Sequence, residues 1–334
     1  MQSAKLFPNA RVSIWCYPHA NIRKIIIFVL MFCAYENRKK IYIVAGHCFS
    51  LTLPSGSHLW PLLTQYDPFL ETKDEKTIFD LELCDSLPEE ADTLIYDAPP
   101  VDGQTVVRLF SSESGLVVEM APDHRLSITA RLWMSSDFKQ GRLLILKDRD
   151  SDIIFSINNS MMLLYAFASS SLSTLEMHSS VILNEGKCYM FLGHSGAGKS
   201  THSRQWLAGV SNSILLNDDN PVVRISSEGR AVAYGSPWSG KTACYKNLSG
   251  DVAAFVCIKQ APHNAIRRMS VPETYAAIYS SSSGLKKHSL MQDALHQSIA
   301  SLATKVPCME LECLPDTDAA RLCHDAISKL ISHD

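Results

Sequence analysis

A glycine-rich segment in the second half of the chain has the residue types and the spacing of a phosphate-binding loop. Its residues fit the pattern Gly-x-x-x-x-Gly-Lys-Ser and are Gly193, His194, Ser195, Gly196, Ala197, Gly198, Lys199 and Ser200. Glycines let backbone N–H groups turn toward phosphate oxygens, the lysine neutralises phosphate charge, and the serine hydroxyl can ligate Mg²⁺. The apolar run 188–192 predicts a strand before the loop, and 201–207 predicts a helix after it. We therefore expect a nucleotide site that uses ATP and Mg²⁺, with Thr201 as a further binding residue.

Two adjacent carboxylates follow the next apolar run, one predicted helix and one short predicted strand after the loop. Residues 214–219 read Ile-Leu-Leu-Asn-Asp-Asp, so Asp218 and Asp219 stand at the end of that strand. Phosphoryl transfer needs a metal ligand and a group that accepts the proton of the attacking hydroxyl. We expect Asp218, together with Ser200, to bind the metal and Asp219 to act as the base, and the pattern also allows the reverse assignment.

Two further segments add candidate catalytic groups. His178 precedes the predicted strand 181–183 and is placed to approach a transferred phosphate or the acceptor, the alternative being a structural histidine. The segment 235–242, Gly-Ser-Pro-Trp-Ser-Gly-Lys-Thr, surrounds Lys241 with turn residues. Such a loop can lay backbone donors and the Lys241 ammonium over a phosphate or an acidic acceptor. The alternative is a tight turn in which Trp238 packs and Lys241 is solvated.

The elements that must position these residues differ between two parts of the chain. Short alternating segments separated by turns predict a β-rich domain, with strands at 41–44, 49–53, 79–83, 93–96, 105–110, 115–120 and 143–146. Helices are predicted later, at 158–170, 272–282, 291–305 and 317–331, around a strand at 308–313. Hairpins are predicted within 181–192 and 222–234. We expect an α/β fold: a β-rich domain over 41–150 that selects the acceptor, then a nucleotide-binding domain over 151–334 with a mixed, hairpin-rich sheet.

Composition limits the partners and the compartment. A formal net charge of -3 without a long basic run argues against nucleic-acid binding. The 10 cysteines include no Cys-x-x-Cys pair, which is typical of a reducing cytoplasm. Residues 1–40 are interpreted as an N-terminal extension, in which Met31 offers an alternative start. Its apolar run 25–35 is too short to span a bilayer as a helix, so membrane association is not favoured.

The residues described so far resemble the catalytic domain of HPr kinase/phosphorylase and the related nucleotide core of phosphoenolpyruvate carboxykinase. The resemblance covers about residues 170–245, and uncharacterised bacterial HPr-kinase-like proteins look closer still. It implies a phosphate contact for His178, metal and base roles for Asp218 and Asp219, and nucleotide roles for Lys199 and Ser200. Thr201 stands where HPr kinases usually carry Glu, and the region 41–150 is unlike their N-terminal domain. HPr itself is therefore not the expected substrate.

These observations together predict a function and leave alternatives open. We expect an ATP- and Mg²⁺-dependent kinase that transfers the γ-phosphoryl group to a hydroxyl of a protein, peptide or small molecule. One alternative is a carboxykinase-like enzyme, which would form phosphoenolpyruvate from oxaloacetate and a nucleotide. The other is a non-catalytic ATP sensor, although the two acids favour chemistry because binding alone needs no base. A homo-oligomer is left open.

Overall fold

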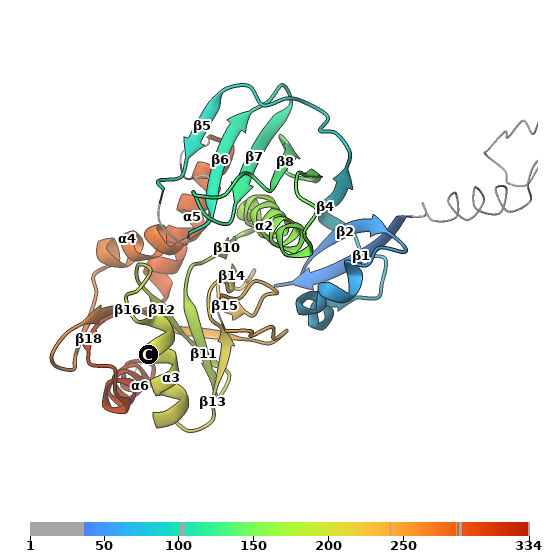
Figure 1. Cartoon of the computed structure of the whole chain (residues 1–334). Helices are drawn as coiled ribbons and strands as arrows, with labels where there is room; N and C mark the ends of the chain where they lie inside the picture. The colour runs from blue at the N-terminus through green and yellow to red at the C-terminus, as the bar shows by residue number, and fades with distance from the viewer. Residues whose placement is uncertain (1–36, 101–103, 241, 285, 287–288, 333–334) are drawn as a thin grey trace, which may run out of the picture. The chain divides into compact units, whose positions relative to one another are not determined.

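The computed structural model describes residues 37–100, 104–240, 242–284, 286 and 289–332. This part of the chain is a mixed α/β protein with two large mixed β-sheets of 9 strands each (Figure 1). Both sheets belong mainly to one compact unit, Lys39–Thr52 with His58–Asp334. The predicted extension lies almost wholly outside the described residues, as do its apolar run and Met31.

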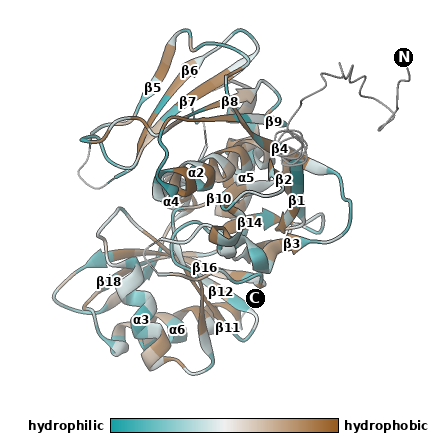
Figure 2. Cartoon of the chain, turned by 45° about the vertical axis from the view of Figure 1, so that its right-hand side comes forward, coloured by the Kyte–Doolittle hydropathy of each residue, from teal (hydrophilic) through white to brown (hydrophobic). Residues whose placement is uncertain are grey.

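The first sheet has the strand order β3-β1-β2-β4-β9-β8-β7-β6-β5. Its strands are β1 (Asn37–Val44), β2 (His47–Pro54), β3 (Leu70–Glu71), β4 (Thr77–Cys84), β5 (Leu94–Asp97), β6 (Val106–Ser111), β7 (Gly115–Ala121), β8 (Ala130–Ser135) and β9 (Gln140–Ile145). Two short 3₁₀ helices, Trp60–Leu62 and Thr64–Phe69, lie between β2 and β3. The seven predicted strands are all present, while β3 and β8 had no predicted counterpart. Apolar residues run along the strands of both sheets (Figure 2).

Helix α2 (Asp150–Ser169) packs against β4, β8 and β9 of the first sheet and against β10 of the second (Figure 1). Ile157, Met161 and Leu164 are fully buried, which explains its apolar sequence. By length and composition the helix is apolar enough to cross a membrane, since its most apolar 18-residue stretch has a mean hydropathy of 1.3. However, 56% of that stretch is buried inside the fold. The predicted start at 158 was too late, because acidic residues in the first turn suit a helix N-terminus.

The second sheet has the order β10-β14-β15-β16-β12-β11-β13, with β18 paired to β16 and β17 paired to β18. Its strands are β10 (Thr174–Glu176), β11 (Ser180–Asn184), β12 (Lys187–Leu192), β13 (Ser213–Asn217), β14 (Val222–Ile225), β15 (Ala231–Tyr234), β16 (Ser249–Gln260), β17 (Ala265–Arg268) and β18 (Cys308–Cys313). Its helices are α3 (Lys199–Gly209), α4 (Val271–Ser281), α5 (Ser289–Lys305) and α6 (Thr317–Ile331). Both predicted hairpins are present as the antiparallel pairs β11–β12 and β14–β15.

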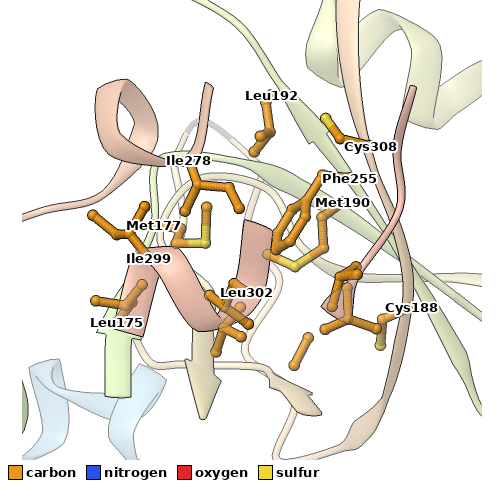
Figure 3. Close-up of a cluster of buried hydrophobic side chains, with 14 of the residues drawn as sticks. Leu175, Met177, Cys188, Met190, Leu192, Phe255, Ile278, Ile299, Leu302 and Cys308 are labelled. Atoms are coloured by element: carbon orange, nitrogen blue, oxygen red, sulfur yellow. The ribbon is translucent and has the colours of Figure 1, made fainter. Parts of the chain in front are cut away.

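The apolar run that precedes the glycine-rich loop is buried on both faces of this sheet. Cys188, Met190 and Leu192 of β12 belong to the core beneath α4 and α5 (Figure 3), whereas Tyr189 and Phe191 pack with residues of α3 and α6. A central strand with two covered faces reads as a continuous apolar run rather than as an alternating one. The long strand β16, parallel to β12 and equally central, was missed because its sequence also lacks alternation.

Candidate active site

The backbone of the glycine-rich loop has the conformation that its sequence predicts. The loop leaves β12 and enters α3 at Lys199, and Gly193 and Gly198 have φ values of 149° and 105°. A Cβ on Gly193 would lie 2.9 Å from the Cβ of Ala197, so the loop closes only around a glycine there. Gln260 at the end of β16 donates from Nε2 to the carbonyl of Gly196 at 3.0 Å. The loop therefore lies at the N-terminus of a helix, where backbone N–H groups favour an anion.

His194, Ser200 and Thr201, the other predicted binding residues, lie in the loop and in the first turn of α3. His194 has its Nδ1 2.7 Å from the carbonyl oxygen of Ser195. Ser200 and Thr201 lie in the first turn of α3, and the Thr201 hydroxyl accepts a hydrogen bond from Arg204 at 3.3 Å. Ser200 is thus the hydroxyl at the helix start, next to Lys199 in sequence.

Lys199 connects the loop to the second candidate region. Its Nζ donates to the carbonyls of Gly193 at 2.8 Å and His194 at 3.3 Å, and lies 3.0 Å from Nε2 of His178. Partial burial lowers the pKa of Lys199 from its usual value, and the charges of Asp219 and Asp218 oppose that shift. The ammonium group is therefore held in a position from which an anion on the loop can reach it.

His178 links Lys199 to one of the two acids. Its Nδ1 lies 3.0 Å from Oδ1 of Asp219, on the opposite side of the ring from Lys199. A lysine ammonium can only donate, so Nε2 accepts from it and the proton of a neutral imidazole resides on Nδ1, facing Asp219. The three side chains thus form a continuous chain from the loop to the carboxylate. The structure brings together His178, Lys199 and Asp219, as the sequence predicts.

Asp218 has a different set of partners. Its Oδ1 accepts from the Ser180 hydroxyl at 2.7 Å and its Oδ2 accepts from the Thr242 hydroxyl at 2.8 Å. Ser180 is itself 2.6 Å from the hydroxyl of Ser203 on α3, so a hydroxyl pair joins this acid to the helix that follows the loop. The two neighbouring acids consequently face different elements, Asp218 toward β11 and α3 and Asp219 toward His178.

Asn217 fixes the backbone that carries both acids, a role that the sequence analysis missed. Its Oδ1 accepts from the backbone N–H groups of Asp219 and Asn220, each at 2.9 Å. Its Nδ2 donates to the Ser236 hydroxyl at 3.1 Å and to the Trp238 carbonyl at 3.2 Å. The side chain is completely buried. An Asn directly before two acids at a strand end is the sequence signal for such an Asx turn.

The segment 235–242 lies against the acids. A Cβ on Gly240 would lie 3.2 Å from the Cβ of Asp219, which shows how closely the two backbones approach. Trp238 is buried, donates from Nε1 to the hydroxyl of Tyr66 at 3.1 Å and stacks near Phe49, so it packs as the alternative interpretation of this segment expected. Lys241, the candidate catalytic group of this segment, lies outside the described residues.

A buried carboxyl near the site also went unpredicted. Glu176 on β10 is 1% exposed, and neither of its carboxyl oxygens has a hydrogen-bond partner among the described residues. Burial, and then the charge of Asp219, raise the pKa of Glu176 well above its usual value. The neutral form that results avoids placing a buried negative charge near that of Asp219.

Two cavities open beside these groups. One, of about 540 Å³, adjoins the loop and is lined by Gly198 and Thr201 together with Ile258, Gln260 and Leu314. The other, of about 740 Å³, is lined by His178, Ser195 and Asp219 on one side and by residues of α2 and β6 on the other. The loop thus contributes to both cavities, whereas Asp219 lines only the larger one.

The described part of the chain contains no cluster of three or more His, Cys, Asp or Glu side chains suited to a metal ion. The described cysteines are free thiols. No protein-family model matches the chain, and no curated protein matches it.

Proposed function

We propose that the protein is an ATP- and Mg²⁺-dependent kinase, built on a nucleotide-binding domain of the HPr kinase type, that transfers the γ-phosphoryl group to a hydroxyl. The observation that carries this proposal is the chain of close contacts from Lys199 through His178 to Asp219, with 3.0 Å from Lys199 Nζ to His178 Nε2 and 3.0 Å from His178 Nδ1 to Asp219 Oδ1. It joins a loop suited to phosphate to a carboxylate suited to a proton. The parallel pairing of β12 with β16 and the adjoining β11–β12 hairpin agree with such a domain.

The nucleotide would take the place beside α3. Backbone N–H groups of the loop and the Lys199 ammonium would hold the phosphates, and binding would draw Lys199 from His178 toward the anion. The smaller cavity is suited to the nucleoside because Ile258 and Leu314 offer apolar surface while Gln260 offers an amide. This arrangement leaves the larger cavity for the acceptor.

The donor groups proposed for the metal are of the kind that bind magnesium. Mg²⁺ prefers oxygen ligands and is commonly held by one or two carboxylates together with phosphate oxygens and water. Ser200 at the helix start and Asp218 at the end of β13 would supply a hydroxyl and a carboxylate. The ion would neutralise charge on the transferred group. The hydroxyls of Ser180 and Thr242 would orient the Asp218 carboxylate.

Asp219 is assigned the role of base. It lines the larger cavity, whereas Asp218 does not and is held by the hydroxyls of Ser180 and Thr242. A base must come within hydrogen-bond distance of the hydroxyl whose proton it accepts. His178 would orient the Asp219 carboxylate through its Nδ1–H and stabilise its charge while the hydroxyl approaches.

The test is the transfer of labelled γ-phosphate from ATP into proteins and small molecules of a cell extract. We expect a labelled species that requires both Lys199 and Asp219, so Lys199→Ala and Asp219→Asn should abolish it. Asp251→Asn is the matched control, because Asp251 pairs with Lys187 on β12 and lines neither cavity. Labelling that persists in Asp219→Asn would contradict the assignment of Asp219 as the base. ATP binding without transfer would favour the sensor, and nucleotide-dependent conversion of oxaloacetate would favour the carboxykinase-like enzyme.

A further inference from the structure

The larger cavity has a wall built from one face of helix α2. Phe155, Asn158, Asn159, Met162 and Leu163 line it, and their spacing of three and four residues places them on a single stripe of the helix. All five are half-exposed, whereas the intervening positions of α2 are largely buried. The helix therefore turns its core face to the first sheet and this stripe to the cavity that contains Asp219. We call this cavity the acceptor cleft.

The described lining of the acceptor cleft is mostly uncharged. It includes no lysine or arginine, and Asp219 is its one described carboxylate. Primary amides come instead from Gln65, Gln104, Asn158, Asn159 and Asn220. Gln65, in the 3₁₀ helix Thr64–Phe69, donates from Nε2 to Oδ1 of Asn158 at 2.8 Å, so this bond joins that helix to α2. Each primary amide carries both donors and an acceptor, so the pair can still offer the Nδ2 of Asn158 and the Oε1 of Gln65 to a ligand.

Such a cleft discriminates by charge. A phosphate or carboxylate on the acceptor would enter beside Asp219, and the described lining offers no lysine or arginine to pair with it, because Lys199, behind His178, would hold the nucleotide. Burying an unpaired charge is costly. A neutral compound can bury apolar surface against Met162 and Leu163 and exchange hydrogen bonds with the amides. The volume of about 740 Å³ is within the range of pockets that enclose a drug-sized ligand or a few residues of a chain.

We propose that the acceptor binds in this cleft through its amide and apolar groups, and that it carries its hydroxyl without a neighbouring anionic group. The inference rests on the proposed kinase function and narrows its substrate class. It excludes sugar phosphates, phosphorylated proteins and hydroxy acids, and it retains two sources, a neutral peptide segment and a neutral small hydroxyl compound.

The experiment uses the full chain with Mg²⁺ and labelled ATP and compares paired probes. One arm contains peptides with a central Ser flanked by Ala and Asn, by Glu, or by phosphoserine, and the other contains glycerol and glycerol phosphate. We expect the neutral member of a pair to take label at least about tenfold faster than its anionic partners. The arm in which this occurs identifies the source. Equal or faster labelling of the anionic members would overturn the proposal.

A charge introduced into the cleft supplies the structural control. Asn159→Lys should reduce the preference for the neutral probe at least about tenfold, because it places a cation in the α2 stripe. Ser151→Lys adds the same charge to an exposed position of α2 that does not line the cleft, and should leave the preference unchanged. Met162→Lys serves as a second cleft variant if Asn159→Lys does not fold. An unchanged preference in a folded cleft variant would overturn the assignment.

Two failures can be told apart. If the protein transfers label in the extract but labels none of the neutral probes, the neutral cleft is refuted while the kinase stands. If it transfers no label that depends on Lys199 in either setting, the kinase itself is refuted and the cleft with it.

Discussion

Asn217→Ala should destabilise the protein and impair phosphoryl transfer while leaving nucleotide binding nearly intact. The change removes an acceptor from two backbone N–H groups, those of Asp219 and Asn220, and a donor from the Ser236 hydroxyl and the Trp238 carbonyl. The Ser236 hydroxyl keeps other partners, because it donates to the Asn220 carbonyl at 2.6 Å and accepts from the Trp238 backbone N–H at 3.2 Å. The two backbone N–H groups therefore account for most of the loss.

The magnitude follows from those two groups. A buried donor left without a partner costs about 1–3 kcal/mol, which gives about 2–6 kcal/mol for both. Asp219 and Asn220 are half-buried, so water can reach part of the gap, and we expect a loss of about 3 kcal/mol in the free energy of unfolding. The acids would also lose their fixed position, and a displacement of about 1 Å at a reacting group can slow a reaction about a hundredfold.

Asn184→Ala is the matched control. Asn184 is a buried asparagine on the neighbouring strand β11, and its Nδ2 donates to the Ser211 carbonyl at 2.7 Å and to the Ser213 hydroxyl at 3.2 Å. Its loss should cost about 1–2 kcal/mol and leave transfer unchanged. Urea unfolding gives the stabilities, and titration calorimetry with Mg·ATP gives the affinities. Equal destabilisation in the two variants, or full transfer activity in Asn217→Ala, would refute the argument that Asn217 fixes the acids.

Three further outcomes are expected. Burial lowers the pKa of His202 from 6.5 to about 4. The unfolded chain therefore binds a proton that the folded chain does not as the pH falls from 6.5 toward 4, and the free energy of unfolding should fall by up to about 3 kcal/mol over that range. His202→Gln should reduce this pH dependence in urea unfolding. Tyr66→Phe leaves the buried indole N–H of Trp238 without its acceptor and should lower the unfolding free energy by about 1–2 kcal/mol. Gly193→Ala places a Cβ 2.9 Å from that of Ala197 at a positive φ, and should weaken ATP binding at least about tenfold by calorimetry.

Each of these outcomes has a control. His263→Gln changes an exposed histidine and should leave the pH slope of stability as it is in the unaltered protein. Tyr245→Phe also removes a tyrosine hydroxyl, but that hydroxyl is not the acceptor of the Trp238 indole N–H. It therefore separates the loss of this hydrogen bond from the general effect of removing a hydroxyl on the free energy of unfolding. Gly186→Ala changes a glycine with φ of 79° in the β11–β12 turn, where a Cβ meets nothing within 4 Å, and should leave ATP binding unchanged. ATP affinity equal to that of the unaltered protein in Gly193→Ala would contradict the account of the loop.

The local elements could be predicted because their signals are local. A strand, a glycine loop and a helix follow one another from Cys188 onward, and Glu185–Gly186 encodes the tight turn between β11 and β12 with φ values of 49° and 79°. The pairing of His178 with Asp219 could be expected only from the resemblance, since no spacing rule joins residues so far apart in sequence. In the structure β11 lies between β12 and β13, which brings the two side chains together.

The acceptor cleft could not be predicted from the sequence. Its walls come from α2, β6 and the segment around Trp238, which are distant in the chain, and the α2 stripe was hidden in what reads as a uniformly apolar helix. β16 was missed for a related reason, because a strand buried on both faces has no alternation to detect. Asn217 carried a signal, an Asn before two acids, but two of its four hydrogen bonds go to Ser236 and Trp238, which only the folded chain brings near.

The central claim is that Lys199 and its loop bind the phosphates of ATP. Titration calorimetry of the full chain with ATP and Mg²⁺ tests it most directly. The variant is Lys199→Ala, and the control is Lys187→Ala, because Lys187 is an exposed lysine at the start of the strand before the loop and pairs with Asp251. We predict saturable binding that is at least about a hundredfold weaker in Lys199→Ala and unchanged in Lys187→Ala. No binding to the unaltered protein, or equal binding to Lys199→Ala, would contradict the account.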